Sequence, residues 1–168
     1  MSAPSSFRGL RFATRGPPLL FVALALGPAA MPVPAQAQKL GDLVIEAPWT
    51  RETPKGADVA VGYLVIRNDG AAPDKLLGGT ADFAQVEIHE MRTQDGVMMM
   101  GELPDGLEVP AHGAVAFAPG GDHLMFTHLL RPLRKGETVE LTLSFARAGA
   151  VTVEVPVAAV GASAPPAK

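Results

Sequence analysis

The sequence predicts an all-β protein, a single-domain Greek-key β-sandwich. Two segments near the end of the chain, 139–145 and 151–157, alternate apolar and polar residues, which is the period of a half-buried strand. A third segment, 59–66, is rich in β-branched residues and ends at the turn sequence Asn68-Asp69-Gly70. Short strands separated by Gly, Pro and Asp are typical of sandwiches and barrels. We find no helical periodicity long enough to compete.

The first 37 residues have the order of a secretory signal peptide. A basic region with Arg8, Arg11 and Arg15 precedes an apolar run over 19–30, and Ala35-Gln36-Ala37 forms the cleavage site. A membrane anchor is the alternative, but this run is shorter than the roughly 20 residues that a spanning helix needs. The sequence contains no cysteine, which excludes a lipid-modified cysteine. We therefore expect a soluble periplasmic protein.

The charge of the remaining chain, residues 38–168, argues against two classes of partner. Removal of the signal peptide takes away 3 of the 14 basic residues and none of the 17 acids, which leaves 11 against 17 and a formal charge of −6. A negative surface disfavours binding to nucleic acids and to anionic membranes. We expect a monomer without a membrane anchor.

Other segments complete the expected organisation. A short strand is expected over 42–46, ending at Ala47-Pro48, and a hairpin is expected from 86–92 and 97–101. The segment 158–168 consists of small residues, proline and one lysine, so a disordered tail is expected there. The folded domain is thus predicted to span 38–157.

No motif of an enzyme is present. The sequence lacks a Gly-x-Ser-x-Gly elbow, a phosphate-binding Gly-rich loop with lysine and a dinucleotide fingerprint. Glu87 and Glu90 have opposite strand parity, so they cannot share a face and are expected to be solvated carboxylates. The protein is therefore expected not to be an enzyme.

Histidine and methionine are concentrated in one part of the chain. After the signal peptide, every residue of these two types lies between positions 89 and 128. Asp95-Gly96 is a strong two-residue hairpin signal, and it would place Met91 opposite Met100. His89, Met91 and Met100 would then project from the same side of the hairpin, together with Met98.

A second strand carries His123 and Met125, which are two residues apart and so project together. Two such strands would supply imidazole nitrogens and thioether sulfurs, and thioethers select copper(I) over zinc, magnesium or calcium. The predicted copper(I) ligands are His89, Met100, His123 and Met125. Binding should weaken at acid pH as imidazoles protonate.

The remaining residues of these types have ordinary interpretations. Met99 faces away from its neighbours and is expected to lie in the core. His112 and His128 are expected to be polar residues without a role in metal binding. Whether Met91 or Met98 joins the copper ligands is left open.

The spacing of these residues resembles that of the periplasmic copper chaperones of the PCuAC family. In that family a histidine is followed by ten residues and a methionine, and then by about twenty-one residues and His-x-Met. In this chain ten residues separate His89 from Met100, and twenty-two separate Met100 from His123-Leu124-Met125. The likeness runs from about Trp49 to Val157 and includes Pro119-Gly120-Gly121. The extra residue is expected in the loop 101–106.

The resemblance implies a cupredoxin-like fold and a surface copper(I) site. It also implies delivery of copper to the binuclear copper centre of cytochrome c oxidase, alongside a Sco-type thiol protein. Some members add a His- and Met-rich tail that engages copper(II), and the segment from Ala158 has neither residue.

The sequence allows three other interpretations. A blue-copper electron-transfer site needs a cysteine thiolate, which the chain lacks. A zinc site is disfavoured because only two histidines align and no cysteine is present. The main alternative is a metal-free secreted sandwich whose methionines only fill space.

Overall fold

The computed structural model describes residues 37–166, and these form eleven β-strands without a helix. The strands are β1 (Gln38–Leu40), β2 (Leu43–Arg51), β3 (Ala60–Asn68), β4 (Asp74–Thr80), β5 (Gln85–Gln94), β6 (Val97–Glu102), β7 (Leu107–Val109), β8 (Gly113–Phe117), β9 (His123–Thr127), β10 (Thr138–Phe145) and β11 (Gly149–Ala158). No helix capable of crossing a membrane occurs within this part of the chain. Of the predicted signal peptide, residues 1–36 lie outside the described residues.

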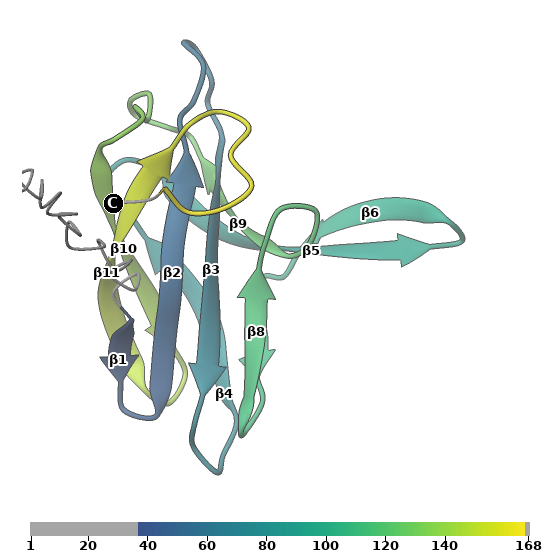
Figure 1. Ribbon diagram of the computed structural model, residues 1–168. Coiled ribbons are helices and arrows are strands. Elements are labelled where there is room, and N and C mark those ends of the chain that lie inside the picture. Colours follow the sequence, from purple (N-terminus) through teal and green to yellow (C-terminus); the bar gives the residue numbers. More distant parts are fainter. Residues whose placement is uncertain (1–36, 167–168) are drawn as a thin grey trace, which may run out of the picture. The chain divides into compact units, whose positions relative to one another are not determined.

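The strands close into a ring, which confirms the predicted all-β sandwich. Neighbours follow the order β2-β11-β10-β4-β5-β9-β3, and an additional β2–β3 pairing completes the circuit. All pairings in it are antiparallel except β2–β11, where Val157 lies beside Thr50 and Ala158 beside Arg51. Closure leaves few strand edges exposed. Figure 1 shows the strands of this barrel-like sandwich.

The interior is filled by the alternate residues of the strands. On β10 and β11, Leu141, Leu143, Val153 and Val155 are each at most 1% exposed, while the residues between them are not buried. The predicted alternation is therefore confirmed. Each such side chain contributes roughly 1.5–3 kcal/mol on transfer from water, before the loss of chain entropy is counted.

β2 is longer than the sequence predicts. The expected end at Ala47-Pro48 is wrong, because the strand continues to Arg51. Ala47 takes a positive φ of 46°, and the pairing of β2 with β3 shifts register between Glu46 and Trp49. A β-bulge accommodates the proline, which has no backbone N–H to donate to the ladder.

A small aromatic cluster covers the outer side of β2 and β3. Trp49 and Tyr63 are opposite each other and both buried, with ring centroids 4.6 Å apart. The guanidinium of Arg51 lies 5.6 Å from the Trp49 centroid and 5.2 Å from that of Tyr63. This geometry is that of a cation–π interaction.

The segment after Val157 is held to the domain. β11 includes Ala158, which is 2% exposed, and Arg51 Nε donates a hydrogen bond of 2.8 Å to the carbonyl of Ala162. The expected disordered tail is therefore wrong for residues 158–162. Small side chains bury little surface, but their backbone groups can still bond to strand and side-chain partners.

The β5–β6 hairpin stands away from the other strands (Figure 1). Among the described strands, β6 pairs only with β5. β5 changes its neighbours at His89: residues up to His89 pair with β9, and residues from His89 onward pair with β6. The hairpin therefore starts at the histidine that the sequence singles out.

Candidate metal site

Two of the predicted ligands lie directly opposite each other. His89 on β5 pairs with His123 on β9, and their ring centroids are 5.7 Å apart. The next pair, Ile88 and Leu124, is buried in the core, at 3% and 0% exposure. Since successive strand residues point to opposite faces, both imidazoles project from the outer side of the sheet. His123 is nevertheless 8% exposed, so it is shielded from water there.

Each imidazole is held by a hydrogen bond. His89 Nε2 lies 2.9 Å from Glu87 Oε2, and the other oxygen of Glu87 accepts a bond of 2.9 Å from Thr127 Oγ1. His123 Nδ1 lies 3.0 Å from the carbonyl oxygen of Gly121. The hydrogen bonds from His89 and Thr127 hold the pKa of Glu87 below its ordinary value. Glu87 is therefore an ionised acceptor at neutral pH.

One ring nitrogen has no partner. Among residues 37–166, His89 Nδ1 is the buried side-chain nitrogen or oxygen that lacks any hydrogen bond. Buried polar atoms are almost always satisfied, and an imidazole nitrogen that is not can serve as a metal ligand. This atom is therefore the candidate ligand of the predicted site.

Met125 lies next to the histidine pair. It follows His123 by two residues on β9, so it projects from the same side, and it is half-buried between Glu87 on β5 and Val61 on β3. The structure thus brings three of the predicted ligands, His89, His123 and Met125, onto two adjacent strands.

Met100 occupies a more open position. The predicted hairpin register is confirmed: Met91 pairs with Met100 and Thr93 with Met98, around a turn in which Asp95 and Gly96 have φ values of 53° and 80°. Met100 is therefore on the strand beside His89 and diagonal to it, but it is 54% exposed.

The prediction that Met99 lies in the core is wrong. Met99 is 48% exposed, and its neighbours Val97 and Met98 are 62% and 59% exposed. The reason is the position of the hairpin, which is not packed between other strands and therefore leaves both of its faces open (Figure 1).

Sequence reasoning missed Glu87, which bonds to His89, and Thr127, which holds Glu87. Glu87 was expected to be a solvated carboxylate, but it bonds to both His89 and Thr127. Its position two residues before His89 on one strand was the available signal, because residues i and i+2 share a face. Thr127 could not be found this way, since its approach depends on the β5–β9 pairing.

The donor set of the site is unusual. Within residues 37–166, no group of three or more His, Cys, Asp or Glu side chains is arranged to hold a metal ion. Next to His89 and His123 lie two thioethers, that of Met125 on β9 and that of Met100 on β6. Such a mixture suits a soft ion.

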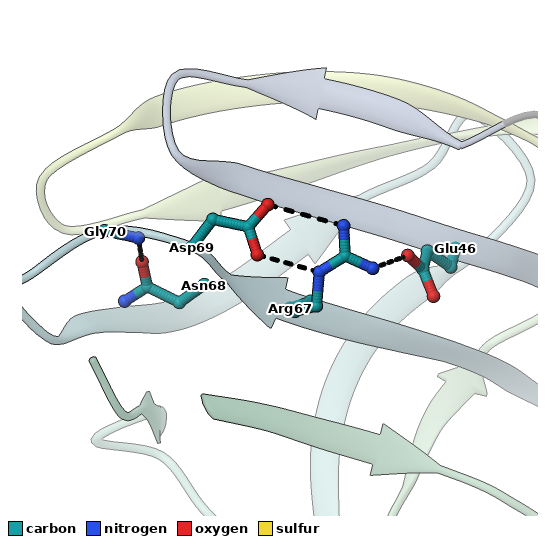
Figure 2. Close-up of polar contacts among 5 residues, drawn as sticks. All are labelled: Glu46, Arg67, Asn68, Asp69 and Gly70. Carbon is teal, nitrogen blue, oxygen red and sulfur yellow. Dashed lines mark hydrogen bonds and ion pairs between the residues drawn. The ribbon is translucent and has the colours of Figure 1, made fainter. Parts of the chain in front are cut away.

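A second polar cluster consists of ion pairs and a turn hydrogen bond. Figure 2 shows Arg67 between the carboxylates of Glu46 and Asp69, while Asn68 Oδ1 accepts a hydrogen bond from the backbone N–H of Gly70. The bond from Arg67 holds the pKa of Asp69 below its ordinary value. Exposed pairs of this kind contribute little to stability.

The other two histidines lie in turns. His112 and His128 have φ values of 51° and 54°, and His112 lines a shallow surface hollow beside Arg67 and Asp69. Neither belongs to β5, β6 or β9.

Comparisons with known proteins agree on one family. The model of the LpqE-like family matches residues 43–157. Lxx21020 of Leifsonia xyli subsp. xyli, which is named as a lipoprotein, is 30% identical over 141 residues, or 81% of this chain and 84% of that protein.

Solved structures of PCuAC domains are similar to this chain in fold and sequence. The copper-bound PCuAC domain from PmoF2 is 30% identical, with a TM-score of 0.64 over 74% of this chain and 99% of that domain. The solution structure of CuI-DR1885 from Deinococcus radiodurans is 28% identical, with a TM-score of 0.56 over 74% of this chain and 81% of the other.

Proposed function

Because the chain belongs to the LpqE-like family, with the fold of PCuAC domains, we propose that it is a copper(I) chaperone that works outside the cytoplasm. It would bind one copper(I) ion through His89, Met100, His123 and Met125. Copper would be cargo, to be handed to another protein.

The unpartnered Nδ1 of His89 is the observation that carries this proposal. Its ring faces His123 at 5.7 Å between centroids, and Met125 is the next residue on that side of β9. Imidazole and thioether together suit copper(I), because thioether sulfur is soft and uncharged. Structures similar in fold include a copper-bound PCuAC domain and a protein named with copper(I).

The exposure of the thioethers supports a role in transfer. Met100, 54% exposed, is the ligand most open to an approaching protein. Thiolates of a recipient would displace the neutral thioethers one at a time, while the shielded histidines retain the ion until the last step. The resemblance to PCuAC chaperones favours the binuclear copper centre of cytochrome c oxidase as the destination, with a Sco-type thiol protein taking part, and the periplasm as the compartment.

A copper(I) titration against a chromogenic chelator tests the proposal. The unchanged protein should take up about one equivalent, and both His123→Ala and Met125→Leu should weaken binding at least tenfold, as loss of one ligand requires. Met99→Leu is the matched control, because this thioether is exposed and lies on the opposite face of β6.

Two outcomes would overturn the proposal. Failure of the unchanged protein to compete for copper(I) would favour the metal-free sandwich. Equal loss of affinity in Met99→Leu and Met125→Leu would mean that methionines bind the ion without regard to their place on the strands.

A further inference from the structure

We infer that Glu87 is a positioning residue that makes His89 bind copper(I) through Nδ1, while the carbonyl of Gly121 leaves His123 to bind through Nε2. The inference rests on the proposed function, since it concerns the same site. It goes further by naming the ligand atoms and the side chains that select them.

The nitrogen of His123 follows from its partner. The carbonyl oxygen of Gly121 can only accept a hydrogen bond, so the nitrogen 3.0 Å away, Nδ1, must carry the proton. The neutral ring has one proton, and the lone pair is therefore on Nε2. A backbone carbonyl that fixes the tautomer in this way is typical of metal-binding histidines.

For His89 the opposite tautomer follows. A carboxylate oxygen also only accepts, so the proton lies on Nε2, which is 2.9 Å from Glu87 Oε2. The second oxygen of Glu87 is occupied by the hydroxyl of Thr127 at 2.9 Å, which holds the carboxylate in place. The lone pair of His89 is thus on Nδ1, the buried atom without a partner.

The cost of that orphan atom strengthens the inference. A buried acceptor without a hydrogen bond destabilises the folded state, and the hydrogen bond from Nε2 to Glu87 holds the ring in the orientation that leaves Nδ1 without a partner. A copper ion bound at Nδ1 would give this atom the partner that it lacks. The hydrogen bonds that link Thr127, Glu87 and His89 therefore orient His89 for metal binding before the metal is bound.

The chain supplies a matched control for Glu87. Glu90 is also on β5, one residue after His89, and its side chain is exposed to the same extent, 26% against 28% for Glu87. It pairs with Arg92 at 3.1 Å and projects from the other face. Its removal takes away the same charge without touching His89.

The first test uses the unchanged, copper-free protein and needs no variant. Two-bond ¹H–¹⁵N correlation spectra, recorded where imidazoles are neutral, should show His89 protonated at Nε2 and His123 protonated at Nδ1. Addition of copper(I) should shift the ¹⁵N resonances of His89 Nδ1 and His123 Nε2. The inference is overturned if His89 carries its proton on Nδ1, or if copper shifts Nε2 of His89 more than Nδ1.

The second test compares copper(I) affinities. Glu87→Ala should mix the tautomers of His89 and weaken binding about 10–100-fold, the usual effect of losing such a partner. Glu87→Gln keeps a carbonyl oxygen for His89 and an amide for Thr127, and should restore both the tautomer and most of the affinity. Glu90→Ala should bind as the unchanged protein does.

The results separate the two proposals. No copper(I) uptake by the unchanged protein would refute the proposed function. Normal uptake by the unchanged protein, together with unaltered affinity and tautomer in Glu87→Ala, would refute the inference and leave the function standing.

Discussion

Asp74→Asn should destabilise the fold, because one buried carboxylate joins β4 to the β10–β11 turn. Asp74 is 7% exposed, and its oxygens accept hydrogen bonds from the backbone N–H groups of Lys75 at 2.7 Å and of Arg147 and Ala148 at 2.9 Å each. A hydrogen bond to a charged group contributes about 1.5–3 kcal/mol, and three that share a carboxylate are not additive. Since asparagine keeps one acceptor oxygen, we expect a loss of about 2–4 kcal/mol in the free energy of unfolding near neutral pH.

The same substitution should change the pH dependence of stability. Burial raises the pKa of Asp74, but the three backbone hydrogen bonds and the charge of Arg147 together lower it by more, so the folded pKa lies below the ordinary 3.8. A depressed folded pKa contributes stability above the unfolded pKa, and this contribution is lost as the pH falls through the folded value. The difference between the unchanged protein and Asp74→Asn should be full above about pH 5 and shrink below about pH 4.

Urea unfolding at a series of pH values, followed by tryptophan fluorescence, measures this difference. Asp82→Asn is the control, since Asp82 is exposed and should change stability little at any pH. A difference for Asp74→Asn that stays constant from neutral to acid pH would refute the reasoning, as would a neutral-pH effect no larger than that of the control.

Three further predictions concern the site, the core and the outer cluster. Met100→Leu should weaken copper(I) binding in chelator competition more than Met98→Leu does, because Met100 is diagonal to His89 and Met98 lies further toward the turn. Equal effects would contradict the proposal that Met100 is a ligand. Gly62→Ala should lower the melting temperature and reduce the free energy of unfolding by about 1–3 kcal/mol, because the added Cβ would lie 2.7 Å from the buried ring of Phe126. An unchanged melting curve would show that the ring can move. Arg51→Ala should lower the free energy of unfolding by about 1–2 kcal/mol, because it removes the cation–π contact and the hydrogen bond to the carbonyl of Ala162. It should also red-shift the fluorescence of the single tryptophan. An unshifted spectrum would mean that the tryptophan ring stays covered.

Local signals in the sequence were enough to predict the hairpin. Asp95-Gly96 takes the left-handed conformations that a two-residue turn requires, and the turn then determines that Met91 faces Met100. The exposure of Met99 was beyond such reasoning. Strand parity tells which residues share a face, but whether a face is covered depends on strands elsewhere in the chain.

The candidate site was predictable in part for the same reason. His123 and Met125 share a side because they are two residues apart, and this follows from the strand alone. That β9 pairs with β5, with His123 opposite His89, is a property of the whole sheet. The role of Glu87 depends on that pairing too, because Thr127 reaches its carboxylate from β9.

The ring of strands also constrains how the protein can fold. Its one parallel pairing joins Thr50 in β2 to Val157 in β11, so the circuit is completed by segments from nearly opposite ends of the domain. Contacts between such distant positions form late, because a long loop must be closed before they contribute. A chain that emerges from its N-terminus therefore cannot complete its sheet until β11 has followed, although β5 and β9, which carry the two histidines, are already present by then.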